Sequence, residues 1–331
     1  MKALVTKAHQ LFEYTEVPDP VAGEGEVLVR IEAVGICGTD LHSYRHADRR
    51  KQFPAIWGHE PAGIVVGGLR DGERVAINPI QWCGTCDLCL NGRNQLCRTR
   101  RVMSLGPTQG AFAQYVAVPD RNAVTLAPGV SARHAALAEP IAVGHHGVVL
   151  GARLLDKPIA AARCLVLGGG AIGLGACLSI RMQAAGSLLL VEAFEDRRRL
   201  VRDLEGIEAI DPAGLPARRD GGFDLVIDAV GSGLSRQAAL ESVAIGGVIV
   251  HLGLADEGPG YDFRDATLRE VALLGAYGYR PTEFREIVDA MGQGRLGSLS
   301  WADTAPLSDG GEIVASLANN QKGSLRTLLV P

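Results

Sequence analysis

The sequence lacks the features that mark several large classes of protein. It contains no apolar run approaching the roughly 18 residues that a helix needs to cross a bilayer, so we expect no membrane partner. Residues 1–5 begin a strand-like alternation without the apolar stretch and cleavage site of a secretory signal, and we expect a cytoplasmic protein. The formal net charge of -4 provides no basic excess, so we expect no nucleic-acid partner.

The composition is otherwise that of an ordinary folded protein, with two unusual residue counts. Its 331 residues, 47% hydrophobic and 21% charged, predict about two globular domains and exclude a disordered chain. Glycine, at 42 residues, exceeds its usual share of roughly 7%, and four of the seven cysteines lie between positions 83 and 97. In a reducing compartment, clustered cysteines of odd total indicate metal binding or catalysis rather than disulfides.

The hydrophobic pattern changes near residue 140. Before it, short strand-like segments separated by glycine and proline turns predict an irregular β domain, with segments at residues 4–5, 26–33, 63–66, 74–77 and 112–118. After it, continuous apolar strands alternate with helical stretches, at residues 164–167, 171–185, 188–191, 224–227 and 248–252. This alternation predicts an α/β domain with a doubly wound parallel sheet. A further amphipathic helix is expected at residues 284–291 and a strand at 325–330.

One cysteine cluster has the spacing C-x2-C-x2-C-x7-C. It consists of Cys83, Cys86, Cys89 and Cys97. Four thiolates complete a tetrahedral Zn²⁺ site and leave no position for a substrate, so this site is expected to hold its loop together. An iron–sulfur cluster, which also uses four thiolates, and four unrelated core cysteines are the alternatives.

A second set of metal-ligand residue types is dispersed along the first half of the chain. It consists of Cys37, His59, Glu60 and Glu139. One thiolate, one imidazole and one or two carboxylates suit a Zn²⁺ ion that keeps an open position for a substrate. Taken singly, each residue has a structural alternative: a buried small side chain, a core histidine, or a carboxylate at the start of a helix.

A glycine-rich loop with the spacing G-x-G-x-x-G follows the strand expected at residues 164–167. Its positions are Gly168, Gly170, Ala171, Ile172 and Gly173. A strand, this loop and a helix are typical of dinucleotide binding, because the backbone and the helix N-terminus approach the pyrophosphate. Glu192 follows Gly173 by 19 residues, where a carboxylate binds ribose hydroxyls and repels the 2′-phosphate of NADP, so NAD is favoured. Arg197 is a candidate counter-charge for that phosphate, or else part of a solvated helix face.

Further motifs accompany these sites. They are Gly58-His59-Glu60 followed by Gly63 and Val65, Glu73-Arg74-Val75, the run at residues 110–116, and Glu139-Pro140-Ile141-Ala142-Val143. In this order the motifs resemble the zinc-containing medium-chain dehydrogenase/reductase superfamily, in its alcohol and polyol dehydrogenase branch of sorbitol, butanediol and threonine dehydrogenase-like members. The resemblance implies a GroES-like β-rich catalytic domain, residues 1–142 and 276–331 with a structural zinc loop at 83–97, around a Rossmann domain at 143–275.

The resemblance also implies roles for single residues. Cys37 and His59 correspond to zinc ligands, with the two glutamates of the dispersed set at the remaining carboxylate positions. Thr39 corresponds to the hydroxyl that contacts the substrate oxygen, Asp40 to the carboxylate that orients the histidine, and His42 to a proton relay. Relatives are commonly dimers or tetramers, so a homodimer or homotetramer is expected.

We therefore hypothesise a dehydrogenase with one catalytic and one structural zinc ion, which reversibly oxidises a secondary alcohol to a ketone with hydride transfer to NAD⁺. The small-molecule substrate is expected to be a polyol, diol, cyclitol or amino alcohol, in a pocket that includes Ser43, Tyr44, Trp57 and Phe112. The alternatives are a catalytically silent or redox-sensing relative that binds a dinucleotide, and a zinc-stabilised binding module.

Overall fold

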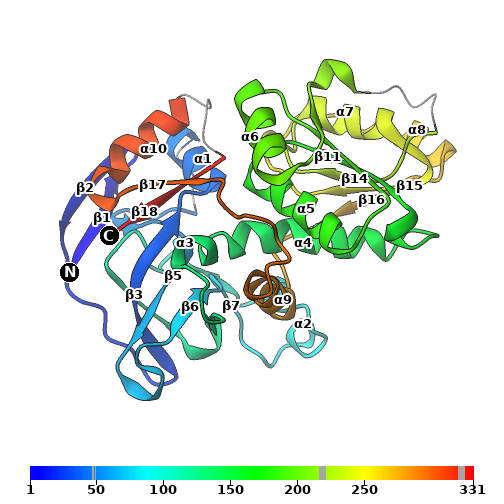
Figure 1. Cartoon of the computed structure of the whole chain (residues 1–331). Helices are drawn as coiled ribbons and strands as arrows, with labels where there is room; N and C mark the ends of the chain where they lie inside the picture. The colour runs from blue at the N-terminus through cyan, green and yellow to red at the C-terminus, as the bar shows by residue number, and fades with distance from the viewer. Residues whose placement is uncertain (47, 49, 216–220, 320–324) are drawn as a thin grey trace. The chain divides into compact units, whose positions relative to one another are not determined.

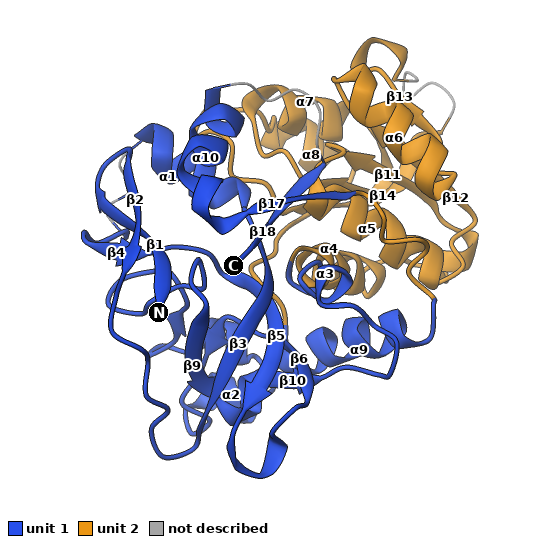
Figure 2. Ribbon diagram, turned by 60° about the vertical axis from the view of Figure 1, so that its left-hand side comes forward, with its two compact units in different colours: residues 1–139, 280–294, 302–331 blue, residues 140–279, 295–301 orange. Residues whose placement is uncertain are grey.

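The computed structural model describes residues 1–46, 48, 50–215, 221–319 and 325–331 (Figure 1). The chain divides into two compact units (Figure 2). Unit 1 comprises Met1–Glu139, Arg280–Gly294 and Ala302–Pro331, and unit 2 comprises Pro140–Tyr279 and Arg295–Trp301. Among the described residues, no helix has the length and hydropathy needed to cross a membrane.

Unit 1 is built on mainly antiparallel sheets. Its larger sheet has the strand order β10-β6-β5-β3-β18-β17, and β9 also pairs with β3. In that order the strands are Ala123–Thr125, Arg74–Ile77, Glu60–Val66, Glu26–Gly35, Arg326–Val330 and Ala302–Pro306, with β9 at Tyr115–Pro119. A smaller sheet has the order β2-β1-β4, at Leu11–Glu16, Lys2–Ala8 and Ala55–Ile56. The irregular β domain predicted for this half is therefore confirmed.

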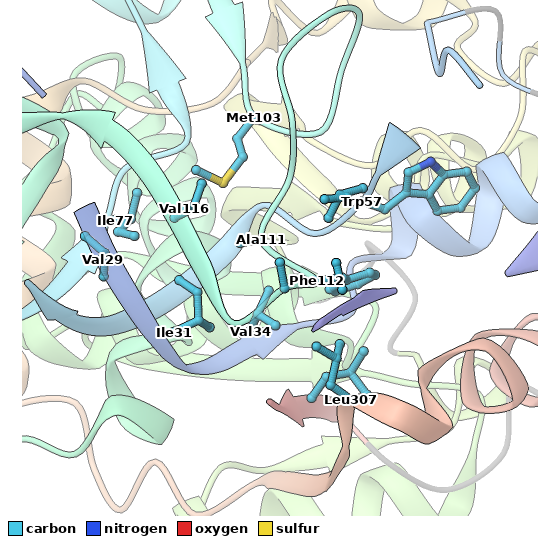
Figure 3. Close-up of a cluster of buried hydrophobic side chains, with 14 of the residues drawn as sticks. Val29, Ile31, Val34, Trp57, Ile77, Met103, Ala111, Phe112, Val116 and Leu307 are labelled. Atoms are coloured by element: carbon cyan, nitrogen blue, oxygen red, sulfur yellow. The ribbon is translucent and has the colours of Figure 1, made fainter. Parts of the chain in front are cut away.

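The core of unit 1 follows from the alternation along its strands. In β3, Val29 and Ile31 are buried whereas Arg30 between them is exposed, because successive side chains of a strand point to opposite faces. Figure 3 shows both side chains in this core, together with Trp57 and Phe112. The prediction that Trp57 and Phe112 line a substrate pocket is wrong, since neither side chain has any exposed surface and both pack in the apolar core.

One predicted strand begins later than expected. Residues 112–118 were predicted from their apolar alternation, but β9 starts only at Tyr115. The preceding backbone is held elsewhere: the amide of Phe112 donates to the carbonyl of Trp57 at 2.8 Å, and the amide of Gly110 to that of Ile56 at 2.8 Å. These backbone contacts, to β4 and to the residue that follows it, replace the regular ladder.

Unit 2 contains one six-stranded sheet in the order β13-β12-β11-β14-β15-β16, in which every pairing is parallel. In that order the strands are Ala209–Ile210, Ser187–Val191, Arg163–Leu167, Phe223–Asp228, Val243–His251 and Ala272–Gly275. Consecutive residues of β11 and β14 are buried, as expected for parallel strands covered on both faces. The predicted α/β domain with a doubly wound, Rossmann-like parallel sheet is confirmed.

Helix α4 (Ala138–Ala152) precedes the first of these strands in the chain. The helices that connect strands of the sheet are α5 (Ala171–Met182), α6 (Glu195–Glu205), α7 (Gly233–Ser242) and α8 (Phe263–Leu268). Helix α5 ends three residues before the predicted end at residue 185. Ala184 has a positive φ of 53°, which a continuing helix does not allow.

Unit 1 also contains helices. They are α1 (Gly38–His46), α2 (Asp87–Leu90), α3 (Ala132–Ala135), α9 (Pro281–Gly292) and α10 (Gly310–Asn319). Helix α9 contains the helix predicted at residues 284–291, and its apolar residues Phe284, Ile287 and Val288 are buried.

The two compact units differ in detail from the predicted domain bounds. Unit 1 gives way to unit 2 at residues 139/140 rather than 142/143, and the chain returns at 279/280 rather than 275/276. Residues 295–301, which the prediction placed in the catalytic domain, belong to unit 2. There the Ser298 hydroxyl donates to Oε1 of Glu205 at the end of α6, at 3.0 Å. The division of the chain by function stays a prediction.

Candidate zinc and dinucleotide sites

Three residues of the dispersed ligand set meet where strands β3 and β5 run side by side. Gly35, the last residue of β3, pairs directly with Glu60, the first residue of β5. Cys37 follows β3 by two residues and His59 immediately precedes β5, so the antiparallel register brings them to one edge of the sheet. Ligand atoms of Cys37, His59 and Glu60 all lie within 4.8 Å of one another.

Gly35 is required for the close approach of the Glu60 side chain to β3. A Cβ atom on Gly35 would lie 2.1 Å from Oε2 of Glu60, a distance that real Cβ atoms do not show. Only a residue without a side chain therefore lets the Glu60 carboxylate lie across the end of β3.

Asp40, in the first turn of α1, contacts both Cys37 and His59. It is fully buried, and its Oδ2 accepts the backbone amide of Cys37 at 3.0 Å while its Oδ1 lies 3.9 Å from Nδ1 of His59. Burial alone would raise the pKa of Asp40, but the charges of Lys51 and His59 and the Cys37 hydrogen bond outweigh burial and lower it. Asp40 is thus held as a carboxylate that faces both proposed ligands.

Glu60 has a buried partner that the motifs did not predict. Arg326 in β18 forms an ion pair with Oε1 of Glu60 and donates to the carbonyl of Ile36 at 2.8 Å. Burial raises the pKa of Glu60 to about 8, and the charge of Arg326 opposes that rise. For Arg326 itself, burial lowers the pKa, but the nearby negative charges, Glu60 first among them, give a net increase.

The remaining residues expected at this site are placed as follows. Oγ1 of Thr39 lies 3.5 Å from Nε2 of His59. His42 is exposed on α1, with its ring 4.8 Å from that of His46. Glu139, in the first turn of α4, is outside the group of ligand atoms within 4.8 Å, although its charge adds to the field at Arg326. Its role as a ligand and the relay role of His42 stay predictions.

The residues present fit a zinc ion. Thiolate, imidazole and carboxylate are the donors that Zn²⁺ takes in catalytic sites. Within the described part of the chain, Oε2 of Glu60 is buried without a hydrogen-bond partner. A cation held by Cys37, His59 and Glu60 would satisfy that oxygen.

The four-cysteine loop forms the second cluster. Neighbouring sulfur atoms of Cys83, Cys86, Cys89 and Cys97 lie 3.5 to 3.9 Å apart, too far for disulfides and close enough to share one ion. The amides of Thr85 and Cys86 donate to Sγ of Cys83 and lower the pKa of its thiol to about 5, the thiolate form that metal binding needs. The donor set fits a structural zinc ion.

The glycine loop of unit 2 joins β11 to α5, as the motif predicts. A Cβ on Gly173 would lie 1.8 Å from the carbonyl oxygen of Gly168, so helix and loop pack too closely for any side chain there. Around Gly170, by contrast, no atom lies within 4 Å of the corresponding position. That open cradle, just before the first helical residues Ala171 and Ile172, fits the approach of a pyrophosphate.

Glu192 follows β12, and its side chain contacts this glycine loop. Its Oε2 accepts the amide of Gly169 at 2.7 Å, and its Oε1 accepts the amide of Phe194 at 2.8 Å. The guanidinium of Arg197 stacks on the Phe194 ring at 5.1 Å. Two backbone hydrogen bonds therefore fix the carboxylate at the carboxyl edge of the sheet, where open α/β sheets bind ligands.

The fold and these clusters define a zinc- and dinucleotide-dependent dehydrogenase. Family models agree: the alcohol dehydrogenase GroES-like domain matches residues 23–128, and the zinc-binding dehydrogenase model matches residues 171–293. The chain is 32% identical over 283 residues to L-idonate 5-dehydrogenase of Vitis vinifera, covering 80% of this chain and 76% of the relative. It is 31% identical over 314 residues to 2-dehydro-3-deoxy-L-galactonate 5-dehydrogenase of Pseudoalteromonas atlantica, covering 90% of each.

Solved structures show the same likeness. A Sinorhizobium meliloti protein with NADP bound has a TM-score of 0.90 and 28% identity, and the match covers 100% of this chain and 99% of that one. Acetophenone reductase of Geotrichum candidum, solved with NAD, has a TM-score of 0.86 and 26% identity, over 100% and 97% of the two chains. The chain belongs to the zinc-containing alcohol and polyol dehydrogenases of the medium-chain dehydrogenase/reductase superfamily. It is an enzyme of secondary-alcohol oxidation that uses zinc and NAD(P).

The two glycines of the dinucleotide loop have separable roles. Gly173→Ala forces a Cβ against the Gly168 carbonyl and is expected to lower the free energy of unfolding by about 3 kcal/mol or more, measured by urea denaturation. Gly170→Ala, with open space around it, is expected to cost at most about 1 kcal/mol of stability. It should weaken NADH binding about tenfold in a fluorescence titration. A stable Gly173→Ala protein would contradict this assignment.

The four-cysteine loop is expected to lose its metal when one ligand is replaced. Cys97→Ser should reduce the zinc content from two ions per chain to one and lower stability by about 3 kcal/mol, because loss of a structural metal removes folding free energy. Metal analysis and thermal unfolding measure the two effects. Cys177→Ser, at a buried cysteine of α5 outside both clusters, is the control and should retain both ions.

Proposed function

We propose that this enzyme oxidises an interior secondary hydroxyl of an open-chain polyhydroxylated substrate, a polyol or sugar acid, to a ketone, with NAD⁺ as the preferred acceptor. The observation that carries the proposal is the convergence of Cys37, His59 and Glu60 within 4.8 Å, beside the Thr39 hydroxyl. Three protein ligands leave a position for a substrate oxygen, whereas the four-cysteine loop leaves none.

Residues on α1 are placed to handle the substrate proton. Zinc bound by Cys37, His59 and Glu60 would make a substrate hydroxyl more acidic. The Thr39 hydroxyl, next to His59, is positioned to hydrogen-bond that hydroxyl. His42 follows Thr39 by three residues, so both side chains lie on the same face of the helix, and His42 reaches solvent. This pair forms a route for the proton from the substrate to water.

Unit 2 supplies the hydride acceptor's site. NAD⁺ would carry the hydride itself, and the protein positions it. The glycine loop offers the open cradle at Gly170, and Glu192 presents a fixed negative charge where the adenosine ribose binds in this fold. The carboxylate can accept hydrogen bonds from the two ribose hydroxyls, and its charge repels a 2′-phosphate. Both effects support NAD over NADP as the cofactor.

The named relatives support the substrate class. They include L-idonate 5-dehydrogenase, L-galactonate-5-dehydrogenase of Escherichia coli, sorbitol dehydrogenase of Bacillus subtilis and several L-threonine 3-dehydrogenases. Carbon 5 of these six-carbon acids and carbon 3 of threonine are secondary carbinol carbons. The shared chemistry is a secondary hydroxyl with a polar group on at least one neighbouring carbon.

A homodimer or homotetramer in the cytoplasm, as the resemblance implies, stays part of the proposal. In unit 2, β13 and β16 stand at the two ends of the sheet order, and the edge of an end strand is where another chain could extend the sheet.

His59→Ala is expected to lower the rate of NAD⁺ reduction by about 1000-fold or more, because the catalytic zinc is lost. The zinc content should fall by one ion per chain, while NADH binding stays intact. The exposed His9→Ala serves as the control and should behave as wild type.

On a panel of L-idonate, sorbitol, butane-2,3-diol, a cyclitol, L-threonine and primary alcohols, the polyhydroxylated compounds should give the highest kcat/KM. Absence of turnover with every compound would favour the catalytically silent alternative.

Glu192 is expected to set the cofactor preference. Glu192→Ala removes the charge that repels a 2′-phosphate, so the ratio of kcat/KM for NAD⁺ to that for NADP⁺ should fall about 10- to 100-fold. Steady-state kinetics with both cofactors at one fixed substrate measures this ratio. Glu195→Ala removes an exposed carboxylate from the start of α6 and should leave the ratio unchanged. An unchanged ratio in Glu192→Ala would contradict the assignment.

A further inference from the structure

Lys51 is a buried cation of unit 1 that no motif or predicted role explains. Its side chain is 1% exposed, although it lies in the loop between α1 and β4. Nζ donates to Oδ1 of Asp40 at 3.1 Å and to Oγ of Ser104 at 2.5 Å. It also lies 4.5 Å from the centre of the Trp57 ring. Lysine is almost never buried unless it is paired, so this arrangement indicates a specific requirement for the charge.

The partner of Lys51 is the Asp40 carboxylate, which contacts both Cys37 and His59. The two oxygens of Asp40 have different contacts. Oδ2 accepts the Cys37 amide at 3.0 Å, and Oδ1 accepts from Lys51 Nζ at 3.1 Å and lies 3.9 Å from Nδ1 of His59. Rotation of the carboxylate would break the contacts to both ligands at once. Lys51 holds Oδ1 by a hydrogen bond at 3.1 Å and therefore opposes such a rotation.

We propose that Lys51 is a positioning residue for the catalytic zinc site. It acts through Asp40, by fixing the carboxylate so that one oxygen anchors the Cys37 loop and the other faces the His59 ring. The inference rests on the proposed function, because it takes Cys37 and His59 as ligands. It assigns Lys51 no contact with zinc, substrate or cofactor.

Removal of the Lys51 charge has a defined consequence. The Asp40 carboxylate is fully buried, and without Lys51 it loses its nearest cation. The carboxylate then no longer holds a single orientation toward His59 and Cys37. Loss of a group that orients a metal ligand costs about 10- to 100-fold in metal affinity. Ser104 contributes one neutral hydrogen bond to Nζ, so its removal should cost much less.

The test measures metal binding directly, by titrating metal-depleted protein with Zn²⁺ against a chromophoric chelator and recording the absorption spectrum of the Co²⁺-substituted protein. Lys51→Met should weaken the catalytic site about 10- to 100-fold and alter the Co²⁺ bands, with the four-cysteine site unchanged. Ser104→Ala should change the affinity by less than about threefold. Lys157→Met removes another lysine–aspartate pair, to Asp224 at 2.9 Å in unit 2, and should have no effect.

A double-mutant cycle decides whether Lys51 acts through Asp40. In the Asp40→Asn background, Lys51→Met should weaken zinc binding by less than about twofold, since the carboxylate it positions is gone. This pair also removes both buried charges together, so it decides the question if Lys51→Met alone does not fold. A large further loss in the double variant would overturn the proposal. So would a folded Lys51→Met protein with lowered stability but wild-type zinc affinity and Co²⁺ spectrum, because that result describes a purely structural lysine.

Failure of the underlying zinc site is distinguishable from failure of this inference. If wild type and His59→Ala bind the same amount of zinc, the proposed ligand set is wrong and the role of Lys51 with it. If wild type binds two ions, His59→Ala binds one and Lys51→Met matches wild type, only the role of Lys51 is wrong.

Discussion

The pairing of Gly35 with Glu60 is the constraint on which the catalytic site depends. It sets the register of β3 against β5, and a shift of one residue would turn the Glu60 side chain to the opposite face of the sheet. The same register places Cys37 and His59, which lie just outside the two strands, at one edge. Leu328 in β18 pairs with Gly35 from the other side, so the position of Arg326 follows from the same residue. Three segments distant in the sequence therefore meet around one glycine.

Charge is balanced pair by pair in this region. The two buried acids next to Cys37 and His59 each have a cation from another part of unit 1: Lys51 for Asp40 and Arg326 for Glu60. Because a buried unpaired charge is strongly destabilising, loss of either cation is expected to lower the stability of this region. The two acids then differ in role. Asp40 contacts the Cys37 amide and the His59 ring, whereas Oε2 of Glu60 has no hydrogen-bond partner and joins Cys37 and His59 in the group that fits a divalent cation.

The sequence predicted those parts of the molecule whose signals are local. The glycine loop of residues 168–173, the four cysteines and the parallel strands carry their spacing or their continuous hydrophobicity within a few residues. Lys51 and Arg326 gave no such signal, because a single lysine or arginine in a loop or strand looks like an ordinary surface residue until the fold buries it. Trp57 and Phe112 were misplaced for the converse reason: proximity to a motif in the sequence does not show on which face of a strand or loop a large aromatic side chain lies.

The separation of Glu60 from Arg326 has a consequence for biosynthesis. Their side chains meet across 266 positions, so a nascent chain carries the Cys37, His59 and Glu60 motifs long before the strand that neutralises Glu60 leaves the ribosome. The four cysteines, by contrast, lie within one short loop and are translated almost together. The buried pairing of Glu60 with Arg326 therefore forms only after β18 has been made, whereas the four cysteines need no residue from a distant part of the chain to come together.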